Sequence, residues 1–427
     1  MTILVVGSGG REHAVVESLA HGPTQPTLYC APGNAGTAGV GSCTNVDARS
    51  NSEVLTAARE LGVDLVVVGP EKPLVEGLCD ELRALDIDCV GPSKAAAALE
   101  GSKVAAKRFM HRHGIPTADY EVANSAEEAF EAIPRIGAPL VVKADGLAAG
   151  KGVVVCGEET EAYEVVHRFM NEGALAEAGH TVVLERALTG YEVTVLALTD
   201  GRAVYELPPS QDHKPIGEGN TGANTGGMGV VCPHPAFDEE LLEEFRKTIL
   251  APTLEGLQAE DLDYRGVLYF GLMVTATGIN VLEYNVRLGD PEAQAVLPLV
   301  ESDLAELFLR TARGELRSYP ARSERAAAAA PRAGCVVVAA SEGYPDSYET
   351  GKPIRGLEDC ENPVFLAGVR EENGRRVTSG GRVLSVCGLG ESIEAAREAA
   401  YRDIARISFS GMYYRRDIGR VSAGPAT

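Results

Sequence analysis

Short apolar runs that end in glycine turns mark the beginning of the chain. Residues 3–6, 65–68 and 87–90 are apolar without alternation, which is typical of strands buried on both faces of a sheet. Residues 12–20, between the first two runs, have the composition of a helix. Strands followed by helices predict a parallel sheet. In such sheets ligands bind at the carboxyl ends of the strands, which is where these glycine turns fall.

The rest of the chain continues the mixture of strands and helices. Between residues 121 and 188 the pattern predicts strand, helix, strand, glycine-rich loop, strand, helix and strand. The clearest strands that we expect are residues 140–143, 152–155, 181–185, 194–198 paired with 203–206, 266–274 paired with 279–284, 333–341, 365–369 and 382–389. The clearest later helices are residues 103–113, 237–257 and 393–407. We place a boundary in the alanine-rich segment 322–331.

Length and composition narrow the class of protein. The chain has 427 residues, enough for roughly two to four structural units, and no apolar run is long enough to span a membrane. Its net charge of −22 and its pI near 4.9 argue against nucleic acid or an anionic membrane as a partner. The nine cysteines are scattered without a C-x-x-C motif, which favours buried thiols in a reducing cytoplasm over zinc or disulfides.

The segment 281–292, V-L-E-Y-N-V-R-L-G-D-P-E, carries the most specific chemistry. Glu283 and Asn285 are two residues apart, so their side chains share a face of an extended strand. A carboxylate and an amide oxygen together suit a hard cation such as Mg²⁺. Arg287 lies on the same face if the strand continues, and its guanidinium suits a phosphate or a carboxylate. The segment therefore predicts a site for magnesium-nucleotide chemistry.

A second segment combines lysines with small residues. Residues 143–155 read K-A-D-G-L-A-A-G-K-G-V-V-V, which predicts a strand, a loop and a strand. Glycines free the backbone to fold over a triphosphate, and Lys143 and Lys151 supply positive charge. This is not a Walker A motif, because Gly152 and a β-branched run follow Lys151. The alternative, a solvated glycine hairpin, does not account for the two lysines.

Three further loops are candidates for ligand contact. Residues 5–13 form a glycine turn before a helix, which favours phosphate or substrate over an empty turn, although Glu12 replaces the third glycine of a dinucleotide fingerprint. Residues 210–229 form a polar loop able to surround a small substrate, with a disordered loop as the alternative. Within it we expect His213 to make a loop hydrogen bond. Residues 185–192 can offer backbone groups to an adenine and a carboxylate to a ribose, although surface glutamates are usually solvated.

Together these motifs resemble the phosphoribosylamine–glycine ligase family of the ATP-grasp superfamily. The resemblance runs along nearly the whole chain. Its motifs are G-S-G-G-R-E-H, A-P-G-N-A-G-T, V-G-P-E-x-P-L, G-P-S-K-A-A-A-x-L-E-G-S-K, K-A-D-G-L-A-A-G-K-G-V, S-Q-D-H-K, N-T-G-G-M-G, R-L-G-D-P-E-A-Q and a terminal Y-R-R-D-I-G. R-L-G-D-P-E is the most specific of them. Tyr191 stands where the family commonly has an acidic residue, which weakens a role for that position and leaves Glu192 in place.

The resemblance implies an α/β fold with an N-terminal Rossmann-like domain (1–100), an ATP-grasp domain (101–320) with a mobile lid near 120–187, and a small C-terminal α+β domain (321–427). It implies that ATP and Mg²⁺ or Mn²⁺ serve the ligation of glycine to 5-phosphoribosylamine through a glycyl phosphate. The products are glycinamide ribonucleotide, ADP and phosphate, in the second step of de novo purine synthesis. We expect a cytoplasmic monomer or weak homodimer without nucleic-acid or membrane partners.

The resemblance also assigns roles to single residues. The implied metal ligands are Glu283 and Asn285, and the implied catalytic residues are Arg287, Asp290 and Lys143. The residues implied to bind ATP are Lys103, Lys143, Gly146, Gly150, Lys151, Gly152, Glu185, Leu188 and Glu192. The residues implied to line the glycine site are Asp212, Lys214, Thr225, Gly226, Gly227 and Asp290. The residues implied to hold 5-phosphoribosylamine are Gly9, Gly10, Asn34 and Glu71.

Three alternative functions stay open on the sequence. Another ATP-grasp ligase or carboxylase fits the lysine-glycine loop, but R-L-G-D-P-E and S-Q-D-H-K argue against it. A nicotinamide-dependent dehydrogenase fits the N-terminal glycine turn but lacks its third glycine. A nucleotide-binding regulatory module without catalysis leaves the combination of Glu283, Asn285 and Arg287 unexplained.

Overall fold

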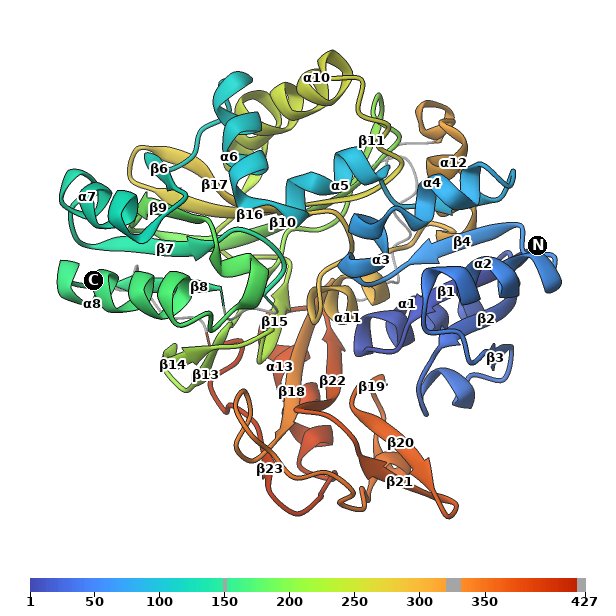
Figure 1. The fold of residues 1–427 in the computed structure, drawn as a ribbon. Helices are drawn as coiled ribbons and strands as arrows, with labels where there is room; N and C mark the ends of the chain where they lie inside the picture. The colour runs from blue at the N-terminus through green and yellow to red at the C-terminus, as the bar shows by residue number, and fades with distance from the viewer. Residues whose placement is uncertain (149–151, 320–331, 421–427) are drawn as a thin grey trace.

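The computed structural model of the chain describes residues 1–148, 152–319 and 332–420. Its first sheet contains β1 (Thr2–Gly7), β2 (Thr27–Pro32), β3 (Cys43–Asn45), β4 (Leu65–Val68) and β5 (Asp88–Val90) in the order β3-β2-β1-β4-β5. Its helices are α1 (Gly10–His21), α2 (Asn51–Glu60), α3 (Glu71–Glu76), α4 (Leu78–Arg83) and α5 (Lys94–Gly101). All neighbouring strands are parallel, so the predicted parallel sheet is confirmed (Figure 1).

A four-stranded antiparallel sheet with its own helices follows. It contains β6 (Tyr120–Ala123), β7 (Leu140–Ala144), β8 (Val153–Cys156) and β9 (Val182–Arg186) in the order β6-β9-β7-β8, with α7 (Ala126–Ile136) and α8 (Glu159–Val166). Its apolar side chains, from Ala123 to Leu184, form a core of their own. We call this unit, on the left of Figure 1, the lid sheet, because it falls in the segment 120–187 for which a lid is expected; its movement stays a prediction. Its separate core means that it shares little apolar packing with the rest of the molecule.

A second antiparallel sheet lies in the centre of the molecule. It contains β10 (Tyr191–Thr199), β11 (Val204–Glu206), β16 (Gly266–Thr275) and β17 (Gly278–Asn285) in the order β11-β10-β16-β17. The helices of this stretch of the chain are α6 (Lys103–Arg112), α9 (Glu239–Phe245), α10 (Ala251–Ala259), α11 (Glu292–Val296) and α12 (Leu304–Arg313). Of these, α11 packs against α1 and α12 packs mainly against β5. Leu4 of β1 and Val281 of β17 belong to one apolar core, so this sheet and the N-terminal sheet pack as a unit.

The last sheet combines strands from two distant parts of the chain. Its order is β12 (Gln211–Asp212), β15 (Gly229–Cys232), β18 (Ala333–Ser341), β22 (Arg382–Gly390) and β19 (Val364–Leu366), with β23 (Met412–Tyr413) beside β18. Helix α13 (Ile393–Ile404) packs on it. Two hairpins, β13 (Pro215–Gly217) with β14 (Thr221–Asn224) and β20 (Val369–Glu372) with β21 (Arg375–Thr378), stand apart from it. Strands β12 and β15 come from the polar loop 210–229 and its continuation, which is therefore structured.

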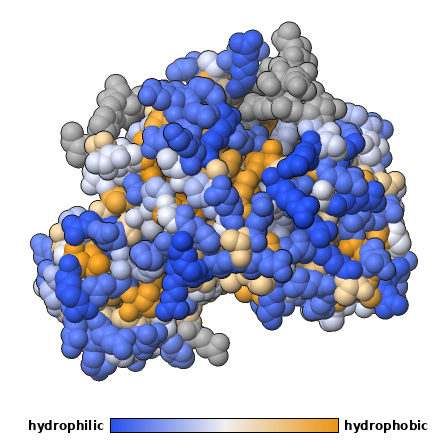
Figure 2. Space-filling view, turned by 90° about the horizontal axis from the view of Figure 1, so that it is seen from above, coloured by the Kyte–Doolittle hydropathy of each residue, from blue (hydrophilic) through white to orange (hydrophobic). Residues whose placement is uncertain are grey.

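Two predicted elements differ from the structure. The apolar run 365–369 is two strands, because Gly368 lies so close to Gly380 that a Cβ there would be 2.6 Å from the Gly380 Cα. The predicted helix 237–257 is interrupted by a π-helical turn, Arg246–Leu250, between α9 and α10. Figure 2 shows that hydrophilic residues dominate the face seen from above, with apolar residues in separate patches. In the part of the chain that the structure describes, no helix is long and apolar enough to cross a membrane.

Candidate active site

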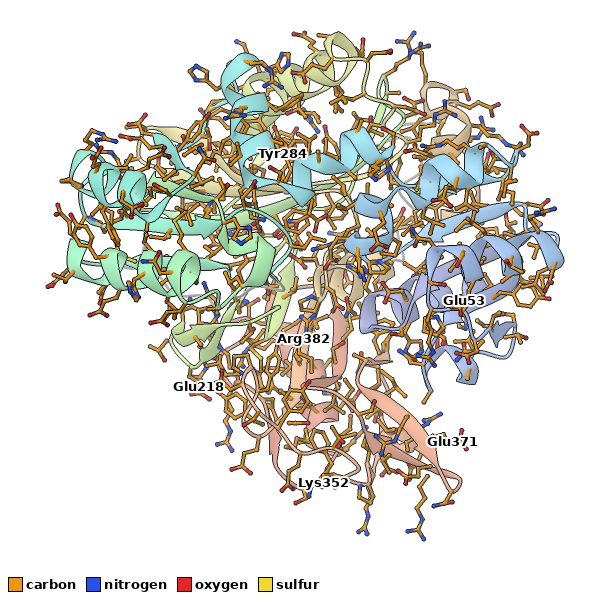
Figure 3. All side chains as sticks on the ribbon, viewed as in Figure 1. Glu53, Glu218, Tyr284, Lys352, Glu371 and Arg382 are labelled. Carbon is orange, nitrogen blue, oxygen red and sulfur yellow. The ribbon has the colours of Figure 1, made fainter. Side chains whose placement is uncertain are left out.

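Strand β17 carries the two predicted metal ligands. Tyr284, labelled in Figure 3, is buried in the core, so Glu283 and Asn285 together face the opposite side of the sheet. Within the described residues, no hydrogen bond or ion pair engages the Glu283 carboxylate. Burial alone would raise the pKa of Glu283, but the charges of Lys214 and Lys103 outweigh burial and lower it to about 2. The site therefore offers an ionised carboxylate beside an amide oxygen.

These two oxygens fit a cation that takes its other ligands from a substrate. In the described ranges no cluster of three or more His, Cys, Asp or Glu side chains could hold a metal on its own. Mg²⁺ typically binds through one or two carboxylates together with waters and substrate phosphates. The donor set on β17 therefore suits a magnesium ion that arrives with a nucleotide.

Arg287 follows β17 and is anchored by two acidic side chains. Its Nη2 lies 2.8 Å from Glu100 Oε1, and its Nε lies 3.5 Å from Glu71 Oε2. Its Nη2 also donates to Asn285 Oδ1 at 3.3 Å. Burial opposes its charge, but Glu100 and Glu71 raise the pKa of Arg287, so the guanidinium stays positive. Sequence reasoning missed Glu100, although a glutamate after the apolar run A-A-A-A-L was a signal.

Two lysines meet one buried glutamate between the lid sheet and the central sheet. Lys143 Nζ lies 2.9 Å from Glu185 Oε1, and Lys107 Nζ lies 3.0 Å from Glu185 Oε2. Lys143 also donates to the carbonyl of Leu282 at 3.0 Å, so it ties β7 to β17. Burial lowers the pKa of Lys107 to about 8, and Glu185 only partly opposes this effect. Lys107 was missed, although it lies four residues after Lys103 and thus on the same helix face.

The predicted phosphate loop connects β7 and β8. Gly150 and Lys151 lie outside the described residues. Gly146 has a φ of +125°, in the region that favours glycine, and a Cβ on Gly152 would lie 2.7 Å from the Cβ of Ala148. The described ends of the loop are therefore built for small residues, and its contact with phosphates stays a prediction.

The polar loop before β13 brings opposite charges together. Lys214 Nζ lies 2.7 Å from Glu192 Oε2. Asp212 Oδ1 is buried and has no hydrogen-bond partner among the described residues. Burial and the nearby Glu292 raise the pKa of Asp212 well above its ordinary value, and Glu292 accepts a hydrogen bond from the Tyr269 hydroxyl at 2.8 Å. An unsatisfied buried carboxyl oxygen is a place for a donor group of a bound molecule.

The following turn passes close to Asp212. The Thr225 hydroxyl accepts the Gly227 N–H at 2.9 Å and donates to the Lys214 carbonyl at 2.7 Å. A Cβ on Gly227 would lie 2.4 Å from Pro291 Cδ and 2.6 Å from Asp212 Oδ1. Only glycine therefore lets this backbone approach both groups.

Two other predicted residues lie in connecting segments. His213 Nδ1 lies 3.2 Å from the Gly229 carbonyl, so the expected loop hydrogen bond is confirmed. Burial lowers the pKa of His213 to about 4, which leaves its ring neutral at physiological pH. Leu188 is half-buried between β9 and β10, and its contact with adenosine stays a prediction.

A cavity of about 300 Å³ opens at the carboxyl edge of the N-terminal sheet. The ends of β1 and β2, the start of α2 and Asp290 form its wall, and Arg49 lies among them. Burial opposes the charge of Asp290, but Arg382 and Arg11 hold its pKa below the ordinary value. The cavity therefore joins the parallel sheet to the loop that follows β17.

The glycine turn at this cavity is occupied by a carboxylate of the chain itself. Glu12 Oε2 accepts the Gly9 N–H at 2.5 Å, and Glu12 Oε1 lies 2.6 Å from Arg11 Nε. A phosphate at the start of α1 would meet this negative charge, so the geometry favours hydroxyl or amine donors there.

Only one of the four residues predicted to hold 5-phosphoribosylamine lines the cavity, and it is Gly9. Asn34 Nδ2 donates to the carbonyls of Ser8 and Leu366, both at 2.8 Å. Glu71 faces Arg287, and a Cβ on Gly10 would lie 2.5 Å from the Gln294 amide. These three residues therefore shape the surroundings of the cavity, and their contact with substrate stays a prediction.

The lid sheet, the central sheet with its carboxylate and amide, and the lysines between them define an ATP-grasp protein. A structure of biotin carboxylase from Campylobacter jejuni shares this fold, with a TM-score of 0.73 over 98% of this chain and 94% of that chain at 15% identity. Three sequence-family models match the chain. They describe the N domain, the ATP-grasp (A) domain and the C domain of phosphoribosylglycinamide synthetase, and they match residues 1–100, 101–293 and 334–421. The chain belongs to the phosphoribosylglycinamide synthetase family.

Individual relatives agree along the whole length. The chain is 45% identical to a phosphoribosylamine–glycine ligase of Clostridium acetobutylicum, over 98% of this chain and 100% of that protein. A crystal structure of phosphoribosylamine–glycine ligase from Thermotoga maritima superposes with a TM-score of 0.84 at 36% identity, over 98% of this chain and all of that one. This membership sets aside the nicotinamide-dependent dehydrogenase that the glycine turn left open.

Proposed function

We propose that this chain ligates glycine to 5-phosphoribosylamine with ATP, giving glycinamide ribonucleotide, ADP and phosphate. The observation that carries the proposal is Glu283, ionised and unpaired among lysines, in a chain that matches ligases of this name from end to end. Glycine's carboxylate is a poor electrophile. Transfer of the γ-phosphoryl group of ATP would make it a glycyl phosphate, which the amine of 5-phosphoribosylamine attacks as phosphate leaves.

The chain's own groups supply positions and charge for this reaction. Glu283 and Asn285 would hold Mg²⁺ or Mn²⁺, which neutralises charge on the phosphates when bound. Lys103 and Lys143 face the same region and would hold the phosphates of ATP. Arg287, kept positive by its two carboxylates, would meet the phosphoryl group or the glycine carboxylate.

The remaining groups suit the two acceptor substrates. The unpaired oxygen of Asp212 would accept a hydrogen bond from the ammonium group of glycine. The cavity at the N-terminal sheet has about the size of a small phosphorylated sugar, and Arg49 supplies a cation in its wall. Asp290 borders both regions, so a glycyl phosphate and an amine held at these places would meet beside it.

Closure of the lid sheet would protect the intermediate, because acyl phosphates react with water. The separate apolar core of the lid sheet supports movement as one body. We infer a cytoplasmic protein, and we expect a monomer or weak homodimer.

The test is ADP release by the purified chain with Mg-ATP, glycine and freshly generated 5-phosphoribosylamine, omitting each in turn. We expect release to require all three, with glycinamide ribonucleotide detected by mass spectrometry. Release that is indifferent to glycine or 5-phosphoribosylamine would reject this pair of substrates. Absence of release under all conditions would reject the ligase activity.

A further inference from the structure

Arg382 reaches from the C-terminal sheet into two loops of the central part of the molecule. It is the first residue of β22, and Figure 3 shows it where that sheet meets the middle of the molecule. Its Nη1 donates to the carbonyls of Asp290 at 2.7 Å and Gly227 at 3.3 Å, and also to the carbonyl of Gly226. Its Nη2 lies 3.3 Å from Asp290 Oδ1. One guanidinium therefore holds two loops at once.

A second side chain, next to a strand of the same sheet, forms a hydrogen bond with the backbone of Gly226. The hydroxyl of Tyr344, which follows β18, accepts the Gly226 N–H at 3.2 Å. The N–H and the carbonyl of Gly226 are thus both hydrogen-bonded by side chains that lie more than a hundred residues later in the chain. The loop at 225–227 has its position set from outside its own sheet.

Space and charge both favour arginine at position 382. A Cβ on Gly226 would lie 2.9 Å from the guanidinium carbon of Arg382, so glycine is what admits the side chain. The Arg382 charge acts on Asp290 and on Asp212, whose unpaired oxygen lies beside Gly227. The two hydrogens of Nη1 are shared among three carbonyls while Nη2 faces the Asp290 carboxylate, so the planar fork serves both loops from two points, whereas a lysine ammonium has its donors at one point.

We propose that Arg382 is a positioning residue for the ligation reaction. It fixes the loop 225–227 and the Asp290 turn around Asp212, so that the C-terminal sheet determines how well the amino-acid substrate is held. This inference rests on the proposed function, because it assigns Asp212 and the glycine turn to the glycine site. Arg382 acts through these groups. Partners that orient metal ligands in the same indirect way typically cost roughly 10–100-fold in metal affinity or activity when they are lost, and we expect a similar magnitude here.

The first test compares Arg382→Ala and Arg382→Lys with the parent chain in steady-state kinetics. We expect kcat/KM for glycine to fall roughly 10–100-fold in Arg382→Ala, with KM for ATP nearly unchanged. Arg382→Lys should recover little, while added guanidinium ion should partly restore Arg382→Ala. Arg370→Ala is the matched control, because Arg370 pairs with Glu372 at 3.0 Å on the exposed hairpin β20–β21. A rise in KM for ATP as large as the rise in KM for glycine, or a fall in kcat with both KM values unchanged, would overturn the inference.

A double-mutant cycle tests the mechanism of positioning. Gly226→Ala places a methyl group against the guanidinium, so it should reproduce the defect of Arg382→Ala. In a chain that already lacks Arg382, the same change should cost little more. Fully additive losses would mean that the two residues act independently, and they would overturn the inference.

Hydrogen exchange gives a readout that does not depend on turnover. Arg382→Ala should speed the exchange of amides in residues 222–229, and Arg370→Ala should not. Unchanged exchange in Arg382→Ala would overturn the positioning role. If the parent chain forms no glycinamide ribonucleotide, the proposed function fails, and the exchange result still decides whether Arg382 holds the loop.

Discussion

At the scale of single residues, Glu283 combines partial burial with a full negative charge. A carboxylate in such a place normally tends to protonate, but surrounding lysines lower its pKa to about 2. The ionised form therefore stabilises the fold above the ordinary pKa of 4.5, and that contribution is lost as the pH falls towards 2. The same charge makes the residue available to a cation at every physiological pH.

We predict that Glu283→Gln removes ligation while the chain stays folded. Glutamine keeps the shape of the side chain and removes its charge, so kcat should fall roughly 10³-fold, with a reduced free energy of unfolding. Product formation and circular dichroism check the two parts. Glu391→Gln is the control, since Glu391 is exposed at the surface. Full activity in Glu283→Gln would contradict the metal assignment.

Lys107 gives a prediction about pH. Its pKa is about 8 in the folded chain, against an ordinary value of 10.5, because it is buried. Between these values the unfolded chain binds more protons, so raising the pH should increase the free energy of unfolding by at most about 1.4 kcal/mol per pH unit. Lys107→Met should lack this rise. Urea denaturation of both chains between pH 7.5 and pH 10 measures the difference, and equal slopes would speak against the lowered pKa.

At the scale of elements, α12 shows how one side chain begins a helix. Asp303 Oδ1 accepts the N–H groups of Ala305 at 3.0 Å and Glu306 at 3.4 Å, and Asp303 Oδ2 accepts the Thr24 hydroxyl at 2.5 Å. The cap thereby also joins α12 to the segment after α1.

We predict that Asp303→Ala lowers the free energy of unfolding by about 1 kcal/mol and leaves kcat unchanged. The orphaned N–H groups of the first turn account for the loss, and α12 lies outside the candidate site. Chemical denaturation and the ligation assay check both statements. A drop in kcat with unchanged stability would contradict this view of the cap.

Elements were predictable where one local pattern decided them. The buried runs of β1 and β4 and the regular helices α6 and α13 follow from local periodicity and composition, and the structure places them within a few residues of the prediction. The break at Gly368 was not predictable, because it depends on close contact with Gly380, which is distant in space until the sheet forms. The π-helical turn after α9 likewise has no local signal.

The site was predictable to the extent that its groups lie together in sequence. Glu283, Asn285 and Arg287 share one segment, and the structure brings them together as their spacing predicted. Glu100 and Arg382 reach the same region from other elements, so only the folded chain reveals that they pair with Arg287 and with the Asp290 turn. Contacts between elements that are distant in the sequence leave no periodic pattern. The sequence therefore predicted the group Glu283, Asn285 and Arg287 but not the contacts that Glu100 and Arg382 make with this region.

At the scale of the whole molecule, charge dominates the surface. The chain has 61 acidic and 39 basic residues, and its net charge of −22 creates repulsion within the compact state. Screening shortens the reach of these charges from about 10 Å at 0.1 M salt to about 3 Å at 1 M salt.

We predict that 1 M NaCl raises the midpoint of thermal unfolding by a few degrees relative to 0.1 M NaCl. Relief of repulsion should outweigh the loss of exposed ion pairs, because single exposed pairs contribute little. Differential scanning calorimetry at the two salt concentrations measures the shift. A lower midpoint at high salt would show that the ion pairs matter more than the net charge.

The sheet that combines β15 with β18 can form only after both strands have been synthesised. Strand β15 ends at Cys232, and its partner β18 begins at Ala333, roughly 100 residues later. At about 5–20 residues per second, a ribosome needs roughly 5–20 s to make that stretch. During this interval one edge of β15 has no partner strand on the nascent chain. An unpaired strand edge can form hydrogen bonds with a non-native strand or with another chain. The loops that Arg382 binds are translated before Arg382 itself. The contacts that fix these loops at the candidate active site can therefore form only near the end of translation.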